Sequence, residues 1–533
     1  MTKFRCLSVM FLAVLVMAGC AGLSGYTPSD VENELVVLHT NDHHGHPLAF
    51  YDYPSPGQGG LPARATLVND VRAEYPNVLV VDAGDMNTGR PESNFFKALP
   101  DIKGYNYIKY DALALGNHEF DLNMAGMQAQ IEASAFPWLC ANAKIDGKYL
   151  DNVKPYIIKK YDGFKVAVFG LVSSKTALTG NPENIKGIVF EDEVKVAMEL
   201  VPELKKKADI VVAVVHMGIY DDPDMGSKRL ATQVPDIALV IDGHTHTKLD
   251  EPEIVRNIIT GKPVRIVQAK HWGLYMGKAV LRFKDGDVTG LDWSSVPVNL
   301  KRRDKKDGKS IYHFVDKELK EDETLLAMLK PYEDEVEKVL SEVIGSADQA
   351  FINDKTREQE TALGDIVADS QLWYMKKMGF DIDFAFQNGG GIRATLGSGD
   401  IQKKTVYEVL PFDNSICVVS LKGDDVIALF NQTPANVGQG AMPQVSDGVT
   451  FTINKSTGKV ENLQIGGSPV DPSKTYTIAL NSYLAAGGDG YKIFKNGGDF
   501  YDSSMMQRDA FIDYVVSVGG NISPKTFGRI TIK

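Results

Sequence analysis

The chain contains little cysteine. Its 533 residues include four cysteines, and two of them, Cys6 and Cys20, fall within the first 20 residues. The other two, Cys140 and Cys417, lie far apart in what we interpret as different domains. This usage excludes a disulfide framework and a cysteine-based zinc site. We therefore interpret Cys140 and Cys417 as small, buried apolar residues.

An excess of basic residues is also lacking. The formal net charge is −12, and no segment carries the basic stripe that a protein needs to bind polymeric nucleic acid. We therefore expect no polymeric nucleic acid partner. A small anionic ligand is still compatible with this charge, because a metal or an arginine cluster can invert the field inside one cleft. At 533 residues the chain is too long for one compact core, which predicts two or three domains.

The N-terminal segment lacks an apolar run long enough to span a membrane. Two basic residues precede an apolar run over residues 7–18, whereas a spanning helix needs about 20 such residues. The run ends in Met17-Ala18-Gly19-Cys20, which resembles a bacterial lipoprotein cleavage box, although methionine stands where leucine is usual. Residues 1–20 are therefore predicted to be a lipoprotein-type signal peptide. It would direct export to the periplasm or cell envelope, with acylated Cys20 as the link to the membrane. The alternative is an ordinary cleaved signal in which Cys20 is incidental.

The rest of the chain alternates apolar runs with amphipathic stretches. After a short polar tether (21–33), buried strands are predicted at 35–38, 78–81, 112–115, 166–169, 210–215 and 237–241, and helices at 61–74 and 194–207. This alternation predicts an α/β domain over 34–321, with its sheets flanked by helices. The charged run 301–309 reads as a solvated loop and 322–347 as one long linking helix. A second α/β domain with many short strands is predicted over 348–533.

Five of these apolar runs end in polar side chains. In α/β sheets, ligands gather beyond the carboxyl ends of the strands, so five separate segments are predicted to aim Asp, Asn and His side chains at one place. Glycines in these motifs permit the sharp turns that bring side chains back to a metal. Neutral imidazole and carboxylate suit zinc, manganese, iron or cobalt better than magnesium or calcium. The segments are His39 to Gly45, Asp82 to Asp85, Gly116 to Asp121, His216, and Asp242 to His246.

A single histidine at a strand end is usually a structural residue. Here all ten histidines precede residue 314, and five of them stand at the candidate site positions of the strand-end motifs, which favours a functional cluster over coincidence. The other five receive the structural interpretation: His39, His43, His46, His271 and His313.

The series Asp-x-His, Gly-Asp, Gly-Asn-His-Glu-Phe-Asp, His and Gly-His-x-His resembles the signature of calcineurin-like metallophosphoesterases. Three longer stretches resemble the bacterial periplasmic 5′-nucleotidase/UDP-sugar hydrolase branch of that family: 39–46, 87–93 and 110–121. The resemblance runs from about Glu34 to the end of the chain. It implies an N-terminal metallophosphoesterase domain followed by a nucleotide-binding 5′-nucleotidase C-terminal domain.

The resemblance implies two divalent metal ions bridged by Asp85, with zinc, manganese or cobalt preferred. The first site would be completed by Asp42, His44 and His246, and the second by Asn117, His216 and His244. His246 is a departure, since some relatives have glutamine there, and this leaves the identity of the ion open.

His118 follows a predicted metal ligand and precedes Asp121 by three residues. We expect His118 to contact the substrate as a cation near the leaving oxygen, with Asp121 fixing its orientation. The alternatives for His118 are a third metal ligand or a loop-capping residue.

The C-terminal domain is predicted to select the substrate. A glycine-rich run at 388–391 leads to Arg393, and glycines followed by a bidentate cation can seat a phosphate, although by itself such a run is by default an ordinary turn. The resemblance implies that Phe412 and Tyr483 sandwich the base. It further implies that Asn414 and Asp489 contact the ribose and base, and that Arg357 and Arg393 bind phosphate. Asn353 stands where relatives can carry a further arginine, which puts the phosphate preference in question.

The predicted function is hydrolysis of nucleotide phosphoesters and phosphoanhydrides, as a 5′-nucleotidase, a UDP-sugar hydrolase or both. The reaction would proceed by in-line attack of a metal-bridging hydroxide on a small nucleotide substrate. Rival hypotheses with the same metals are a 2′,3′-cyclic nucleotide phosphodiesterase and an NAD pyrophosphatase. A nucleotide-binding envelope receptor without catalysis is the rival from another class. The sequence leaves the oligomeric state open.

Overall fold

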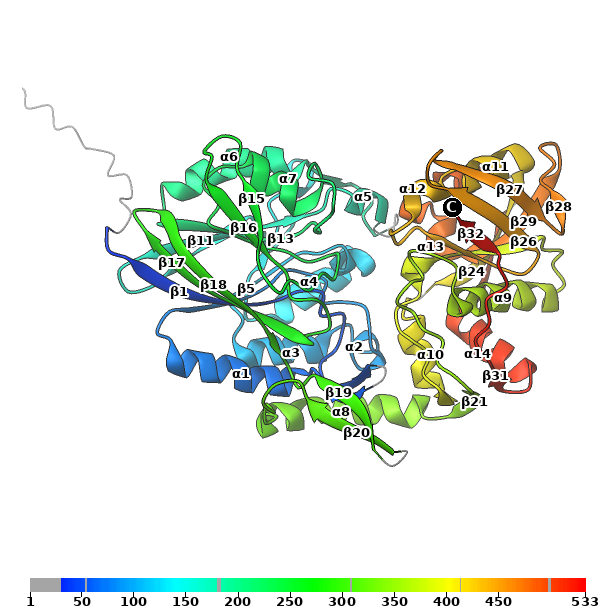
Figure 1. The fold of residues 1–533 in the computed structure, drawn as a ribbon, viewed down its shortest axis with the longest axis horizontal. Coiled ribbons are helices and arrows are strands. Elements are labelled where there is room, and N and C mark those ends of the chain that lie inside the picture. Colours follow the sequence, from blue (N-terminus) through cyan, green and yellow to red (C-terminus); the bar gives the residue numbers. More distant parts are fainter. Residues whose placement is uncertain (1–29, 53–54, 180–183, 307–308, 413, 497–499) are drawn as a thin grey trace, which may run out of the picture.

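The computed structural model describes residues 30–52, 55–179, 184–306, 309–412, 414–496 and 500–533. The predicted signal peptide, Cys20 and most of the tether lie outside these residues. Two bodies stand side by side, the N-terminal one in blue to green and the C-terminal one in yellow to red (Figure 1). Among the described residues, no helix combines the length and the apolar character needed to cross a membrane.

The N-terminal body is built around two sheets of mixed direction. In each, most neighbouring strands run parallel, and antiparallel strands are added at the edges. The first sheet has the order β18 (Asp287–Pro297), β17 (Tyr275–Lys284), β1 (Asn33–Thr40), β4 (Val78–Asp82), β5 (Ala112–Ala114), β6 (Trp138–Leu139) and β9 (Val153–Lys154). The second has the order β10 (Tyr156–Lys160), β11 (Lys165–Val172), β13 (Ile210–His216), β14 (Leu239–Ile241), β16 (Pro263–Val267) and β15 (Glu253–Arg256).

Side-chain alternation along the strands explains why the two sheets pack face to face. Leu35 and Val37 of β1 point into a core shared with Val212 and Val214 of β13. The residue between them, Val36, points the other way, into a core with helices α1 (Leu61–Glu74) and α3 (Leu99–Ile108). The second sheet is covered in the same way by α6 (Glu193–Lys205) and α7 (Gly226–Gln233). Each sheet is therefore covered by helices on one face and by the other sheet on its opposite face.

The strand and helix predictions for this body agree with the structure in type. All six predicted runs overlap strands, namely β1, β4, β5, β11, β13 and β14, although the runs 112–115 and 237–241 extend beyond β5 and β14. The helix predicted over 61–74 is α1, and the one predicted over 194–207 is α6, which begins one residue earlier because Asp192 caps it by accepting a hydrogen bond from the Lys195 N–H at 2.9 Å.

The prediction of a solvated loop over 301–309 is wrong. Residues Lys301–Lys306 form β19, which pairs with β20 (Lys309–Phe314) as an antiparallel ribbon. The ribbon projects from the molecule, so neither of its faces needs an apolar stripe. For this reason the charged sequence did not show the alternating pattern by which a strand is recognised. Its backbone pairs with β20, and the Lys301 ammonium lies 4.9 Å above the centre of the Phe314 ring.

The prediction of a single helix over 322–347 is also wrong for its last residues. Helix α8 spans Glu323–Leu340, capped by Asp322, and it packs on α1 and α3 of the N-terminal body and on α10 (Lys403–Val409) of the C-terminal body. Residues Val343–Ala347 form β21 instead, paired with β23 (Gly399–Gln402) and β31 (Asn521–Ile522). Tertiary pairing therefore overrides the helical spacing there. The domain limits of 34–321 and 348–533 stay a prediction.

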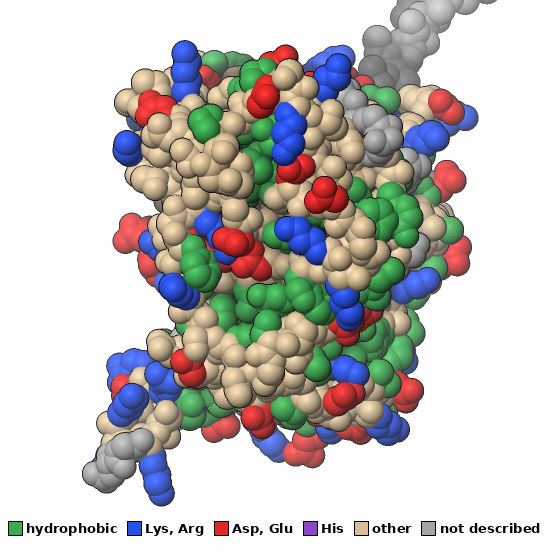
Figure 2. Space-filling model, turned by 90° about the vertical axis from the view of Figure 1, so that its right-hand side faces the viewer, with side chains coloured by type: hydrophobic (Ala, Val, Ile, Leu, Met, Phe, Trp, Pro, Cys, Tyr) green, Lys and Arg blue, Asp and Glu red, His purple; other side chains and the backbone are tan. Residues whose placement is uncertain are grey.

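The C-terminal body contains a five-stranded and a four-stranded sheet with their own apolar core. Helices α9 (Ala362–Lys377) and α14 (Gln507–Ser517) pack on each other, and α9 also packs on β22. Figure 2 faces this end of the molecule and shows acidic and basic side chains interspersed on its surface. Both Cys140 and Cys417 are free and buried, as expected. The five-stranded sheet has the order β25 (Pro443–Val445), β22 (Phe384–Asn388), β29 (Thr475–Asn481), β24 (Ser415–Lys422) and β30 (Phe500–Met506), and the four-stranded one β28 (Ser468–Pro469), β27 (Lys459–Ile465), β26 (Val449–Asn454) and β32 (Ile530–Ile532).

Candidate active site

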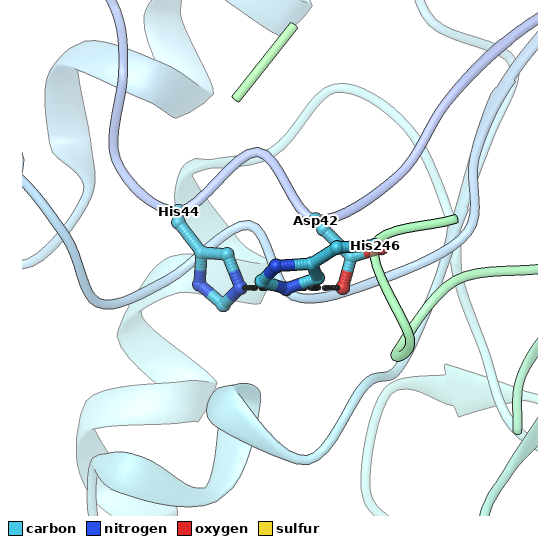
Figure 3. Close-up of side chains that lie close together, drawn as sticks. All are labelled: Asp42, His44 and His246. Atoms are coloured by element: carbon cyan, nitrogen blue, oxygen red, sulfur yellow. Dashed lines mark hydrogen bonds and ion pairs between the residues drawn. The ribbon is translucent and has the colours of Figure 1, made fainter. Parts of the chain in front are cut away.

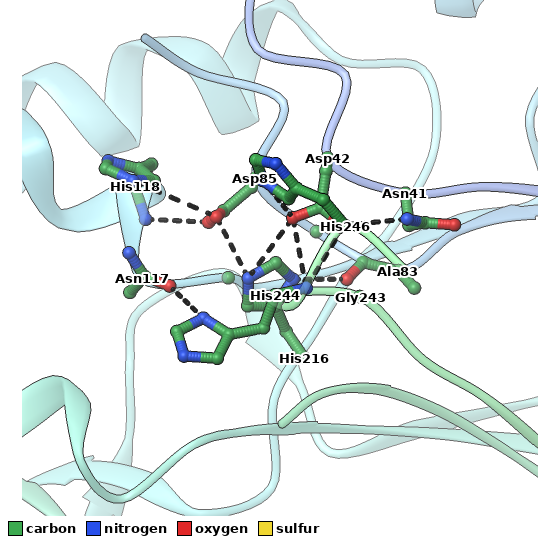
Figure 4. A network of polar contacts seen from close by, with 12 residues as sticks. Asn41, Asp42, Ala83, Asp85, Asn117, His118, His216, Gly243, His244 and His246 are labelled. Atoms are coloured by element: carbon green, nitrogen blue, oxygen red, sulfur yellow. Dashed lines mark hydrogen bonds and ion pairs between the residues drawn. The ribbon is translucent and has the colours of Figure 1, made fainter. Parts of the chain in front are cut away.

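The five strand-end motifs meet at one edge of the N-terminal sheets (Figures 3 and 4). β1 leads to Asp42 and His44, β4 to Asp85, β5 to Asn117 and His118, β13 ends in His216, and β14 leads to His244 and His246. Three overlapping groups have ligand atoms within 4.8 Å of one another: Asp42–His44–His246, His44–Asp85–His118 and Asp85–His216–His244. The spatial convergence predicted for these residues is therefore present.

The first predicted metal group is compact (Figure 3). His246 Nε2 lies 3.3 Å from Asp42 Oδ1 and 3.2 Å from His44 Nε2, and His44 Nε2 lies 4.0 Å from Asp42 Oδ1. Asp42 and His44 have positive φ angles of 52° and 46°, which turn both side chains back toward the cluster. The fold thus holds a strained backbone at this position to bring the side chains together.

Asp85 lies between the two predicted groups (Figure 4). Its Oδ2 is 3.8 Å from His44 Nε2 on one side and 2.9 Å from His216 Nε2 on the other. On the second side, His244 Nδ1 lies 2.9 Å from Asn117 Oδ1. This is the position that a bridging carboxylate requires.

Backbone carbonyls set the tautomers of two of these histidines. His44 Nδ1 lies 3.0 Å from the Asn87 carbonyl oxygen, and His216 Nδ1 lies 2.7 Å from that of Ala83. A carbonyl only accepts, so in each ring Nδ1 carries the donated proton and Nε2 is left facing the carboxylates. Two imidazole nitrogens and two carboxylates that converge in this way repel one another unless a cation lies among them. The donor set therefore fits divalent metal ions.

The electrostatics of the cluster agree with this fit. Burial and the nearby Arg393 hold the pKa of His44 well below its usual range, and burial also lowers that of His244 to about 3, so both imidazoles are neutral. Burial lowers the pKa of His216 too, but Asp85 and Asp42 raise it more, to about 10. The two carboxylates therefore create a strong preference for positive charge at His216 Nε2.

Glu119 is a functional residue that the sequence analysis missed. Its buried carboxylate accepts four backbone N–H groups, from Asp85 (2.9 Å), Met86 (2.8 Å), Asn87 (3.2 Å) and Gly116 (2.7 Å). One side chain thereby ties the loop that carries Asp85 to the loop that carries Asn117 and His118. The available signal was its place inside the Gly-Asn-His-Glu motif, directly after two predicted site residues.

Asp242 ties two loops together on the opposite side of the cluster, and the sequence analysis did not assign it this role either. Its Oδ1 accepts the N–H groups of Met217 (2.9 Å), Gly218 (3.1 Å) and Gly243 (2.8 Å), and its Oδ2 accepts the Ser227 hydroxyl. The loops that follow His216 and precede His244 are therefore fixed to each other by one buried acid.

His118 stands beside the cluster and reaches toward the C-terminal body. Its Nδ1 is 2.7 Å from Asp121 Oδ2 and its Nε2 is 4.0 Å from Asp85 Oδ2, while its ring stacks on Phe412 with centroids 5.7 Å apart. Burial lowers the pKa of His118, but Asp121 and Asp85 raise it above its ordinary value overall. Asp121 also accepts a hydrogen bond from the Thr88 hydroxyl at 2.5 Å, which fixes its position.

A cavity of about 1030 Å³ lies between the two bodies. We call it the nucleotide cavity, after the ligand predicted for the residues that line it. From the N-terminal side Asp85, Asn117, His118, Asp121, His244 and His246 line it. From the C-terminal side all six predicted substrate residues line it, namely Arg357, Arg393, Phe412, Asn414, Tyr483 and Asp489. The structure thus brings together residues from both halves of the chain.

Side chains on the C-terminal wall of this cavity bond to one another. Asp489 Oδ1 accepts the Tyr483 hydroxyl at 2.8 Å, and its Oδ2 accepts the Asn388 amide at 2.8 Å. Arg393 Nη2 lies 3.0 Å from His44 Nε2, across the two bodies. Asn388 was not singled out by the sequence analysis except as the start of a glycine-rich run. Asn353 caps a turn through its hydrogen bond with the Thr356 hydroxyl at 3.0 Å.

Comparison with known proteins identifies the family. Residues 35–248 match the calcineurin-like phosphoesterase family, and residues 343–496 match the 5′-nucleotidase C-terminal domain. The chain is 35% identical to a 5′-nucleotidase of Vibrio cholerae over 95% of both chains, and 34% identical to the protein UshA of Escherichia coli over 91% of both. The chain belongs to the 5′-nucleotidase family. A solved 5′-nucleotidase precursor of Thermus thermophilus has 27% identity and a TM-score of 0.83, covering 94% of this chain and 99% of that one.

Membership of the 5′-nucleotidase family confirms the predicted fold class, two α/β domains of metallophosphoesterase and 5′-nucleotidase C-terminal type. The protein is a metal-dependent phosphoester hydrolase, and the calcineurin-like fold implies divalent metal ions. The family also places both sides of the nucleotide cavity in one enzyme, because each matched domain supplies one wall.

Proposed function

We propose that the protein hydrolyses the phosphoesters and phosphoanhydrides of nucleotides in the cavity between its domains. One observation carries this proposal. The cavity is lined on one side by the carboxylate, amide and imidazole groups that fit divalent metal ions, and on the other by two arginines, two aromatic rings and polar groups. A nucleotide has the matching parts, a phosphate, a base and a ribose.

In this proposal, Asp42, His44, Asp85 and His246 hold one divalent metal ion, and Asp85, Asn117, His216 and His244 hold the other. The pair would supply Lewis-acid polarisation of the phosphoryl oxygens and an activated water. Zinc, manganese and cobalt suit this set of imidazole and carboxylate donors.

The chain's own residues position the substrate and the leaving group. Arg357 and Arg393 would bind the phosphate through their guanidinium groups. Phe412 and Tyr483 would stack on the base, and Asn414 and Asp489 also line the cavity. His118 is held by Asp121 at 2.7 Å with a raised pKa, so it can place positive charge or a proton at the leaving oxygen.

We further propose that the protein is exported and anchored in the cell envelope through acylated Cys20. The basis is the sequence of the first 20 residues alone. Radiolabelled palmitate incorporation into the wild-type chain, and its loss in Cys20→Ser, would test the anchor. Export with no label would leave an ordinary signal peptide.

Direct measurement of phosphate released from AMP, and chromatographic separation of the products of the other three substrates, test the function. AMP, UDP-glucose, 2′,3′-cyclic AMP and NAD are offered to the wild-type enzyme and to Asp85→Asn, each with and without a chelator. We expect turnover of AMP and UDP-glucose that the chelator abolishes and that Asp85→Asn reduces by at least about 10³-fold. Turnover of only cyclic AMP or only NAD would replace this proposal by one of those activities. Nucleotide binding without turnover, in the presence of added manganese, zinc or cobalt, would indicate a receptor.

A further inference from the structure

Two adjacent isoleucines are exposed at one end of the N-terminal body. Ile258 is 71% exposed and Ile259 is 58% exposed, and both lie in the turn that joins β15 to β16. Single exposed apolar side chains are ordinary, whereas a contiguous exposed apolar patch indicates a site of interaction. We call residues 257–262 the isoleucine turn.

Asn257 holds the isoleucine turn in a fixed shape. Its side chain is buried, and its amide nitrogen donates to the carbonyl oxygens of Ala231 (3.0 Å) and Val234 (2.9 Å) at the end of α7. Its amide oxygen accepts the N–H groups of Ile259 and Thr260, each at 3.0 Å. The backbone of the turn is therefore tied to the body from below, and the exposed isoleucines are held outward.

The isoleucine turn lies at the same end of the body as the start of the described chain. Lys262 of the turn pairs at 2.5 Å with Asp287, the first residue of β18. Nearby on β17, Phe283 pairs with the first residue of β1, which lies at the left end of the molecule in Figure 1. Asp30 follows Cys20 by ten positions, a length of chain that spans at most about 36 Å when extended. A membrane that holds Cys20 is therefore within reach of the turn.

The active site lies at the opposite end of the same strands. The isoleucine turn precedes β16, whereas the predicted metal ligands follow the carboxyl ends of β13 and β14, and β14 runs parallel to β16. A surface that contacts the turn would therefore leave the nucleotide cavity open to the solvent on the far side of the body.

The size and charge of the turn indicate a lipid partner. A stable protein interface buries about 800 Å² on each partner, and two isoleucine side chains supply far less apolar surface than that. A bilayer accepts them without needing a complementary shape. The turn contains no acidic residue, and Arg256 and Lys262 stand on either side of the isoleucines. Apolar side chains flanked by cations are suited to the boundary between acyl chains and headgroups.

We propose that the isoleucine turn inserts into the lipid bilayer in which Cys20 is anchored. This rests on the lipid anchor of the proposed function. The turn is a second point of attachment beside the tether, so it fixes the orientation of the enzyme on the membrane. In that orientation the nucleotide cavity faces away from the lipid.

The test places a fluorophore that is sensitive to polarity on the turn of the full-length lipoprotein. Ile258→Cys is labelled and reconstituted into vesicles of phosphatidylethanolamine and phosphatidylglycerol, while the native Cys140 and Cys417 are buried. Val189→Cys on β12 (Ile188–Phe190) carries the same label as the matched control, because Val189 is 58% exposed and its neighbour Phe190 packs on Phe120 of the active-site side.

We expect nitroxide-bearing lipids to quench the label at position 258 at least about threefold more than the label at position 189, with emission at shorter wavelength. Both labelled enzymes should hydrolyse AMP as the wild type does, since neither position lines the nucleotide cavity. Equal quenching at the two positions would overturn the inference. A label at position 258 that neither lipid-borne nor aqueous quenchers reach would also overturn it and would indicate a protein partner or a second copy.

Failure of the anchor has a different signature. Wild-type enzyme that washes off the vesicles would count against acylated Cys20, and with it against the orientation proposed here. Enzyme that stays on the vesicles while the turn remains in water would leave the anchor intact and contradict only the inserted turn.

Discussion

The two walls of the nucleotide cavity are held in place by different means. On the metal side, buried carboxylates fix the loops through backbone N–H groups: Glu119 accepts four and Asp242 accepts three. On the nucleotide side, functional groups bond to each other, as Asp489 does to Tyr483 and Asn388. The first arrangement uses carboxylates that are not among the predicted ligand-binding groups, whereas the second uses those predicted groups themselves. The chemistry is therefore preorganised and the recognition is adaptable.

The largest effect should come from the residue that links the two walls. His118 bonds to Asp121 on the metal side and stacks on Phe412 on the nucleotide side. We expect His118→Ala to lower kcat for AMP by roughly 10²–10⁴, because a group that stabilises the leaving oxygen is lost. Steady-state kinetics at a saturating metal concentration measure this change in kcat.

His313→Ala, which removes an exposed histidine far along the chain on β20, serves as the control and should have full activity. Metal content of His118→Ala, measured by inductively coupled plasma spectrometry, should equal that of the wild type. A parallel loss of metal would mean that His118 is a third ligand instead.

The next effect tests the preorganised wall. Glu119→Gln keeps the shape of the side chain, but its amide nitrogen cannot accept the backbone N–H groups that one carboxylate oxygen accepts. We expect metal affinity to fall by about 10- to 100-fold, since the loops of Asp85 and Asn117 lose their common tie. Activity measured against metal concentration would show a shifted midpoint that excess metal restores.

The exposed Glu132 provides a matched substitution, and Glu132→Gln should leave the midpoint unchanged. If Glu119→Gln lowered only the melting temperature, with the metal titration unaltered, the residue would stabilise the fold without positioning the ligands.

The same contrast explains what the sequence could and could not predict. Parallel strands end at one edge of a sheet, so the motifs after β1, β4, β5, β13 and β14 predicted a cluster without further knowledge. The roles of Glu119 and Asp242 depend on the directions of backbone N–H groups, which no side-chain pattern encodes. On the nucleotide wall, Arg357, Phe412 and Tyr483 come from separate segments with no shared spacing, and only the family resemblance pointed to them.

The misassigned elements have a similar cause. The ribbon at 301–314 is held by backbone pairing, and β21 is a strand because β23 and β31 lie beside it. The partner of β19 is the next strand along the chain, whereas both partners of β21 lie far from it in the sequence. The approach of Gly397 to Tyr51 could not be predicted either, since the two residues meet only in the folded chain.

A smaller effect should come from the adaptable wall. Tyr483→Ala removes an aromatic face, and stacking of a base contributes about 1–3 kcal/mol, so KM for AMP should rise by about tenfold with little change in kcat. Tyr483→Phe keeps the ring and loses only the hydroxyl that bonds to Asp489 at 2.8 Å. It should raise KM by less than about threefold. Equal defects in both variants would show that the hydroxyl, and not the ring, holds the nucleotide.

The smallest effect at neutral pH should come from the ion pairs that join the two domains. Burial raises the pKa of Glu92, but Arg90 of the same domain and Lys404 of the opposite domain lower it more, to about 2. Because the folded pKa lies below the unfolded value, this carboxylate stabilises the fold at pH above about 4.5 and loses its contribution as pH falls toward 2. Lys404→Met removes one cation and leaves Arg90, so activity at pH 7 should change less than about threefold. The melting temperature should already be lower at pH 7, and the further loss of stability on acidification should be smaller and end at a higher pH, because the folded pKa of Glu92 lies closer to its unfolded value. Melting temperatures from pH 7 to pH 3 measure this, with Lys403→Met, whose partner Glu342 is exposed, as the control. Identical acid profiles for Lys404→Met and the wild type would show that Arg90 alone sets the charge of Glu92, and that the domains are held together chiefly by the packing of α8 on both.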